Sequence, residues 1–220
     1  EGGEAAMTAA SGMAAISSTM LSLLQAGDEV IVDHTLYGNT FAYFTQGLPP
    51  LGIVTRVVDC TDVAAVEAAT NGKTKIIYFE TPANPNWRLI DIAEMARIAR
   101  GVGARVVVDN TFATPVFQRP LEQGAAIVVH SATKYLGGHG DLLAGVVVGS
   151  KDDVTRIRSV GLRFMTGATL SPFNCFLIMR GLKTLDVRME RHASSALALA
   201  RLLEGNSKIA SVSYPGLDSF

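Results

Sequence analysis

A lysine and two hydroxyl residues stand just beyond an apolar segment, in the stretch VVHSATKYLGGHG that begins at Val128. The apolar run 125–129 predicts a buried strand. Lys134 would then lie at the mouth of a low-dielectric interior, where a neutral, nucleophilic amine is favoured. Ser131 and Thr133 offer hydroxyl donors of the kind that hold a phosphate. Together they indicate a Schiff-base lysine beside a phosphate site, which is the protein side of pyridoxal phosphate chemistry. A surface lysine in a glycine-rich loop is the alternative.

Three further side chains with useful chemistry follow other predicted strands. Tyr37 comes after the strand 29–33, Asn84 comes after the strand 75–80, and Asp109 closes the strand 105–109. Ligands bind outside the carboxyl ends of parallel strands, so we expect these side chains to share one edge of a sheet with Lys134. Each has a structural alternative, such as a core cap for Tyr37 and a helix cap or salt bridge for Asp109.

A run of small residues, 10–15, lies in a predicted helix that spans 8–25. Its main-chain N–H groups at Gly12 and Met13 could approach an anion, and a helix N-terminus stabilises a surface charge by ~0.3–1 kcal/mol. Close packing of a small-residue helix is the alternative. With this helix, the chain has every part that a pyridoxal phosphate site needs. These parts are an amine (Lys134), a phosphate cup (Gly12, Met13, Ser131, Thr133), a ring cover (Tyr37), an anion for the ring nitrogen (Asp109) and a donor for the ring oxygen (Asn84).

Predicted strands and helices alternate along the 220 residues, which indicates an α/β fold with a mostly parallel sheet sandwiched by helices. Apolar residues make up 48% of the chain, enough for a large core. Further helices are expected over 62–69, 91–101 and 151–160 and from 174 to 203, and a further strand over 207–214. We expect a cofactor-binding large domain over 1–185, with 186–220 as the start of an incomplete small domain.

Composition argues against several partners. A net charge of −1 favours neither nucleic acid nor a membrane surface, and no apolar run is long enough to span a bilayer. Cys60 and Cys175 show no metal or redox spacing, which is typical of a reducing cytoplasm. His34 and His192 lack companion ligands, so no metal site is expected. We interpret the chain, which begins with Glu1, as an internal portion of a longer protein.

Seven motifs make the chain resemble the Cys/Met-metabolism (γ-family) enzymes that depend on pyridoxal phosphate: SGMAAI, TLYGNT, ETPANP, VVVDNTF, QRPL, HSATKY and RGLKTLDVRM. The resemblance covers essentially the whole chain. It implies a fold-type I, aminotransferase-like enzyme that acts on sulfur amino acids or activated homoserines, as a cytoplasmic homotetramer built from active dimers.

The resemblance also implies a role for each matching residue. It implies that Lys134 bonds the cofactor and shuttles a proton, that Asp109 faces the pyridine nitrogen, and that Tyr37 stacks on the ring and acts as acid or base. The remaining positions would contact the phosphate (Gly12, Met13, Ser131, Thr133) or other parts of the cofactor (Asn84, Thr111).

Within the family, the stretches GHGDLLAG and MTGATLSP are most similar to members that release a thiol from methionine. Asn39 stands where methionine-specific members usually carry Cys, and Arg163 and Phe164 stand where they carry Lys-Asp. We expect γ-elimination of methionine, or of cystathionine or homocysteine, to a thiol, 2-oxobutanoate and ammonia. The alternative is γ-replacement on O-acetyl- or O-succinylhomoserine, by a sulfhydrylase or a cystathionine γ-synthase. A non-catalytic binding protein and a dinucleotide-binding domain are rival classes, but no GxGxxG follows a strand.

Overall fold

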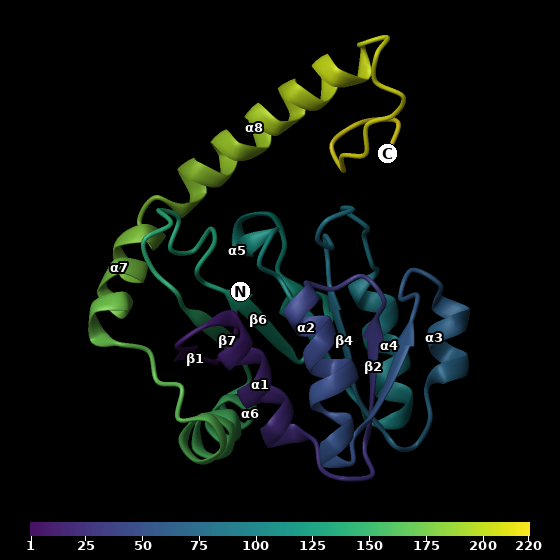
Figure 1. The fold of residues 1–220 in the computed structure, drawn as a ribbon, viewed down its shortest axis with the longest axis vertical. Helices are drawn as coiled ribbons and strands as arrows, with labels where there is room; N and C mark the ends of the chain where they lie inside the picture. The colour runs from purple at the N-terminus through teal and green to yellow at the C-terminus, as the bar shows by residue number, and fades with distance from the viewer.

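A computed structural model of the chain describes residues 1–220 as one sheet with helices on both faces (Figure 1). The strands lie in the order β1-β7-β6-β5-β4-β2-β3, and only β7 runs antiparallel to its neighbours. Their bounds are β1 (Ala5–Ala9), β2 (Glu29–Asp33), β3 (Val54–Val58), β4 (Thr74–Glu80), β5 (Arg105–Asp109), β6 (Ile127–Ser131) and β7 (Gly145–Gly149). The predicted α/β class with a mostly parallel sheet is confirmed.

Side chains at the helix starts account for several boundaries. Asp62 accepts the N–H of Ala65 and Asp91 accepts that of Glu94, so each caps a helix at the position where it begins. The α-helices are α1 (Gly12–Leu23), α2 (Gly38–Ala42), α3 (Val63–Ala69), α4 (Ile92–Val102), α5 (Thr114–Phe117), α6 (Lys151–Arg156), α7 (Pro172–Leu182) and α8 (Leu185–Glu204). Shorter π and 3₁₀ segments are η1 (Tyr43–Gly47), η2 (Pro49–Leu51), η3 (Pro120–Gln123) and η4 (Ile157–Thr166).

The sheet separates two cores because successive side chains of a strand point to opposite faces. Val107 and Val129 belong to the core that α1 covers, whereas Val106 and Val108 belong to the core beneath α3 and α4. Central strands buried on both faces therefore read as continuous apolar runs. The helix α4 packs against this second core with five buried residues: Ile92, Met95, Ala96, Ile98 and Ala99.

Two assignments made from the sequence are wrong. Thr8, expected in a helix, lies in β1, which pairs with β7, and the helix begins only at Gly12. Residues 207–214, expected to form a strand, form none, because no neighbouring strand offers their backbone hydrogen-bond partners. The strand expected over 125–129 lies two residues later, at Ile127–Ser131, so Ser131 ends the strand instead of following it.

The last helix, α8, extends away from the sheet and carries the C-terminal segment with it (Figure 1). A third core cluster joins α7 and α8 to the turn after β6, through Ile178, Leu185 and Leu136 among others. The C-terminal segment returns to the loop after β4, where the rings of Tyr214 and Trp87 lie 6.0 Å apart. No helix combines the length and the apolar character needed to cross a bilayer. A domain boundary near residue 185 stays a prediction.

Candidate active site

Three polar residues end three adjacent parallel strands. Glu80, Asp109 and Ser131 are the last residues of β4, β5 and β6, and Glu80 and Asp109 are register partners. Each comes two positions after a residue of the core that α1 covers, so the twofold period of a strand places all three on the face of that helix. The strands therefore deliver two carboxylates and a hydroxyl to one spot.

A cavity of about 320 Å³ opens at this spot, between the strand ends, the start of α1 and the loop after β2. Its wall includes all nine residues that the sequence predicts for the site: Gly12, Met13, Tyr37, Asn84, Asp109, Thr111, Ser131, Thr133 and Lys134. The structure thus brings the whole predicted set together, while the role of each residue stays a prediction. The wall also includes residues that the sequence analysis did not assign, among them Ser11, Glu80, Phe112 and Leu143.

The N-terminus of α1 forms one end of the cavity. The Ser11 side chain caps the helix by accepting the N–H of Ala14, and the N–H groups of Gly12 and Met13, in the first turn, have no intrahelical acceptor. A Cβ on Gly12 would lie 2.9 Å from Cβ of Ser131, so only glycine lets the Ser131 hydroxyl stand beside this turn. A helix N-terminus next to a hydroxyl suits a phosphate.

Thr133 stands at the same end but is already engaged. Its hydroxyl donates to the carbonyl of Ala144 at 3.2 Å and accepts the N–H of Ala144 at 3.0 Å. It can therefore donate to an anion only by exchanging the carbonyl partner. Its structural effect is to fasten the turn that carries Lys134 to the start of β7.

Asp109 lies at the base of the cavity with its two oxygens in different surroundings. Oδ1 accepts both the N–H of Thr111, at 3.0 Å, and the Thr111 hydroxyl. Oδ2 has a single long contact, 3.4 Å, with the buried Tyr78 hydroxyl. Burial raises the pKa of Asp109, and the two bonds from Thr111 oppose that rise. A cation next to Oδ2 would favour the ionised carboxylate.

Glu80 is a second carboxyl in the same wall, and it is buried; the sequence analysis did not assign it to the site. Oε1 accepts the N–H of Tyr37 at 2.7 Å. Burial, with the charge of Asp109 adding to it, raises the pKa of Glu80 to about 8. The signal was present in the sequence, because Glu80 closes the apolar run IIYF much as Asp109 closes VVV.

Tyr37 stands at the open side of the cavity and is 49% exposed, so one side of its ring is free to cover a planar ligand. The side-chain amide of Asn39 donates to the Tyr37 hydroxyl at 3.3 Å. The residue at position 39 therefore contacts the group expected to act as acid, at a position where this chain departs from the methionine-specific pattern.

Lys134 reaches the cavity from its rim, on a tight turn in which its N–H bonds Ser131 O at 3.1 Å and its carbonyl accepts Gly138 N at 2.7 Å. Its position is as predicted, but its surroundings are not. The residue is exposed, whereas the sequence predicted a low-dielectric mouth.

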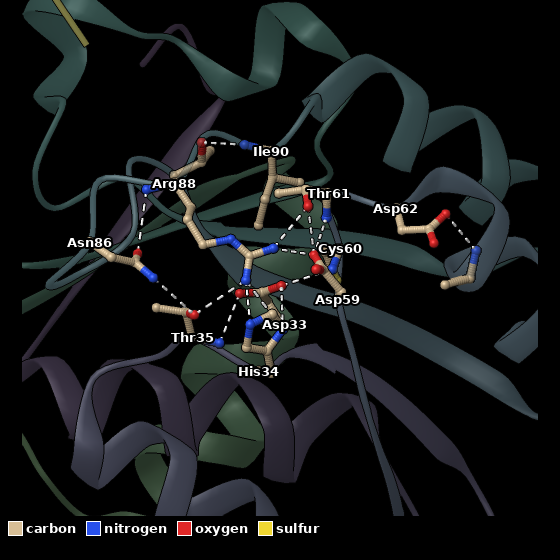
Figure 2. A network of polar contacts seen from close by, with 12 residues as sticks. Asp33, His34, Thr35, Asp59, Cys60, Thr61, Asp62, Asn86, Arg88 and Ile90 are labelled. Atoms are coloured by element: carbon tan, nitrogen blue, oxygen red, sulfur yellow. Dashed lines mark hydrogen bonds and ion pairs between the residues drawn. The ribbon is translucent and has the colours of Figure 1, made fainter. Parts of the chain in front are cut away.

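The loop that leads to Tyr37 is also held at its start, residues 34–35, by the Arg88 network shown in Figure 2. The Arg88 guanidinium contacts the His34 ring and Asp59, and donates to Thr61 at 2.8 Å and to Thr35 at 3.5 Å. Arg88 thereby ties the ends of β2 and β3 to the loop between β4 and α4.

The groups that line the cavity are those that a phosphorylated pyridine aldehyde would need. The cavity offers an amine at the rim, a glycine-dependent anion cradle, a half-buried carboxylate whose Oδ2 has only one long contact, and an aromatic cover. Solved structures place the fold in the same class. The chain matches metB from Corynebacterium glutamicum with a TM-score of 0.95 at 38% identity, covering 99% of this chain and 56% of that one. It matches cystathionine gamma-lyase from Lactobacillus plantarum, complexed with L-serine, with a TM-score of 0.94 at 40% identity over 99% and 57% of the two chains. The fold is that of the fold-type I pyridoxal phosphate-dependent enzymes.

Within that class, the chain belongs to the Cys/Met metabolism PLP-dependent enzyme family, whose model matches residues 1–220. The cofactor is therefore pyridoxal 5′-phosphate. The chain is 56% identical to L-methionine gamma-lyase of Pseudomonas putida over all of its length and 55% of the relative. It is 44% identical to O-succinylhomoserine sulfhydrylase of Pseudomonas aeruginosa over all of its length and 54% of the relative. The chain spans about half the length of the curated relatives it matches.

Proposed function

We propose that the full-length protein is a carbon–sulfur lyase that eliminates the γ substituent of methionine, or of cystathionine or homocysteine. With methionine, one water is consumed and methanethiol, 2-oxobutanoate and ammonia are released. The supporting observation is the single cavity wall that holds Lys134 and Asp109 together with the phosphate cradle at Gly12 and Ser131. Identity of 47–56% to several L-methionine gamma-lyases supports the choice of elimination.

Pyridoxal phosphate, when bound, supplies an electron sink for a carbanion at the substrate Cα. Lys134 Nζ is the group that we propose takes the Cα proton, because it is the amine on the cavity wall. Oδ2 of Asp109 would accept a hydrogen bond from the protonated ring nitrogen, because Oδ1 already accepts two hydrogen bonds from Thr111. The Tyr37 hydroxyl would protonate the departing sulfur. Gly12, Met13, Ser131 and Thr133 would hold the phosphate, and Asn84 would donate to the ring oxygen.

Replacement at Cγ is the second candidate. Two observations favour keeping it: the sulfhydrylase relative at 44% identity, and Asn39 beside the Tyr37 hydroxyl. The test is a substrate panel on full-length protein with cofactor, containing methionine, cystathionine, homocysteine, and O-acetyl- and O-succinylhomoserine with sulfide. Thiol and 2-oxobutanoate from the sulfur substrates without added nucleophile would support elimination. Homocysteine formed only from an acylhomoserine and sulfide would overturn it.

We further propose a homotetramer built from active dimers, in the cytoplasm. An exposed apolar surface supports association: Phe173, Phe176 and Met179 on α7 are 68%, 62% and 67% exposed, and Phe164 is 71% exposed. A patch of this kind marks an interaction surface in a folded protein. Two free cysteines, Cys60 and Cys175, are compatible with a reducing compartment. Size-exclusion chromatography with light scattering on the full-length protein tests the assembly.

A further inference from the structure

We propose that Glu80 is a positioning residue that sets the Tyr37 ring over the cofactor by holding the main-chain N–H of Tyr37. The proposal rests on the function proposed above, because it assigns Tyr37 a task at the cofactor. Glu80 would act only through Tyr37, without contacting the reacting atoms.

The hydrogen bond joins two elements that are distant in the chain. Oε1 of Glu80 lies 2.7 Å from the Tyr37 nitrogen, although the residues are 43 positions apart. Glu80 is 6% exposed at the end of a central strand, which makes it a fixed point. Tyr37, in contrast, is 49% exposed at the end of a loop, directly before α2. The rigid strand therefore defines where the loop places its ring.

The partners of Glu80 exclude an ordinary structural ion pair. No lysine, arginine or histidine forms a salt bridge with it. Its carboxyl instead faces main-chain N–H groups: that of Tyr37, bonded at 2.7 Å, and that of Asn84, which also lowers the pKa of Glu80. A buried carboxyl without a cation costs stability, and a well-packed apolar residue would serve the core better. Its position beside Asp109 in the cavity wall points to a role in the site.

The loop would remain folded without Glu80, because the Arg88 network holds it independently (Figure 2). Arg88 contacts His34 and donates to Thr35, and Asn86 donates to the Thr35 hydroxyl at 3.5 Å. These contacts fix the start of the loop, at residues 34–35. The bond from Glu80 fixes its end, at Tyr37. Removal of Glu80 should therefore free the end of the loop and leave its start in place.

The test compares Glu80→Leu, which removes the acceptor, with Glu80→Gln, which keeps a carbonyl acceptor at the same length. Both are made in full-length protein with pyridoxal phosphate, and Glu67→Gln, on the surface, is the matched control. Amide hydrogen exchange over residues 36–41 should accelerate at least about 10-fold in E80L and remain near wild type in E80Q. The kcat should fall about 10- to 100-fold in E80L with a small change in KM, and E80Q should recover most of it. E67Q should change neither readout.

Three results would overturn the proposal. The first is unchanged exchange over 36–41 in E80L. The second is a loss in E80Q as large as that in E80L, since charge and not the hydrogen bond would then matter. The third is full additivity of E80L with Tyr37→Ala in kcat, because Tyr37→Ala removes the ring and a residue that acts through that ring must then be coupled to it. Failure of the proposed lyase function has a different signature: wild type would be inert on every substrate, while the exchange result would stand.

Discussion

The hydroxyl of Thr111 donates to Oδ1 of Asp109 and accepts the N–H of Ser131 at 2.8 Å. One side chain thus links the carboxylate proposed for the ring nitrogen to the strand end proposed for the phosphate. The link fixes the separation between the two ends of the ligand site. It also leaves Oδ2 of Asp109 as the oxygen available to a ligand.

Replacement of Thr111 by Val should remove this link with little change in shape. Asp109 would lose a hydroxyl donor, so its pKa should rise further and its ionised form should be less available. We expect pyridoxal phosphate to bind roughly 10-fold more weakly, since a hydrogen bond to a charged group is worth about 1.5–3 kcal/mol. Fluorescence titration of cofactor-free protein measures the affinity. T111S, which keeps the hydroxyl, should bind like wild type, and equal weakening of both variants would contradict the role of the link.

Gly12→Ala should damage the anion cradle. The new Cβ would lie 2.9 Å from Cβ of Ser131, so the helix start or the strand end must move. We expect weaker binding of pyridoxal phosphate by at least about 10-fold, corresponding to about 1.4 kcal/mol. The same substitution at Gly101 is the control, because a Cβ there meets nothing within 4 Å. Binding by G12A at the wild-type level would show that the phosphate lies elsewhere.

The stability of the cofactor-free protein should fall between about pH 5 and pH 8. Glu80 has a folded pKa of about 8, above its ordinary value of 4.5, so the folded state binds the extra proton in this window. Stability linked to Glu80 is therefore present below pH 4.5 and is lost as the pH rises through 8. The loss across this window should be on the order of 3–4 kcal/mol, since each pKa unit between the ordinary and the folded value corresponds to about 1.4 kcal/mol. The charges of Asp109 and Asp33 contribute to it, because both raise the pKa of Glu80.

Thermal unfolding of wild type and E80Q across that range measures the effect. E80Q carries no titrating group at position 80, so its unfolding temperature should fall less steeply. Glu29 does not disturb the comparison, because its hydrogen bond with Arg56 lowers its pKa to about 2, outside the window. Parallel curves for the two proteins would show that Glu80 is already ionised at pH 5.

Position 39 should influence the choice of substrate. Asn39→Cys removes the amide that donates to the Tyr37 hydroxyl at 3.3 Å and frees the phenolic oxygen. We expect kcat/KM for methionine to rise about 2- to 10-fold relative to that for cystathionine, the range of one net hydrogen bond. N39A lacks the donor as well and should shift in the same direction. If the ratio of kcat/KM for methionine to that for cystathionine is unchanged in both variants, position 39 does not influence substrate specificity.

Local sequence signals were sufficient for much of the site. Asp109 stands out because a carboxylate ending an apolar strand needs a partner, and Gly12 stands out within a run of small residues. Lys134 was correctly placed at the cavity because it follows the end of an apolar strand. Its exposure was not predictable, because burial of a turn depends on what packs over it and not on the strand that precedes it.

The errors share a dependence on distant partners. Thr8 reads as helix locally, yet β1 exists because β7, more than a hundred residues later, pairs with it. The segment 207–214 has strand-like composition but no neighbour to pair with. The hydrogen bond from the Tyr37 N–H to Glu80 likewise joins the loop after β2 to the end of β4, and no local sequence pattern predicts such a contact.

The central claim is that Lys134 Nζ bonds the cofactor aldehyde, and borohydride reduction tests it most directly. Full-length protein with pyridoxal phosphate is reduced, digested and mapped by mass spectrometry, alongside Lys134→Ala. The account predicts a pyridoxyl group on the peptide that contains Lys134 and loss of the visible cofactor band on reduction, with neither in the variant. Modification at another lysine, or a colourless wild-type protein, would contradict it.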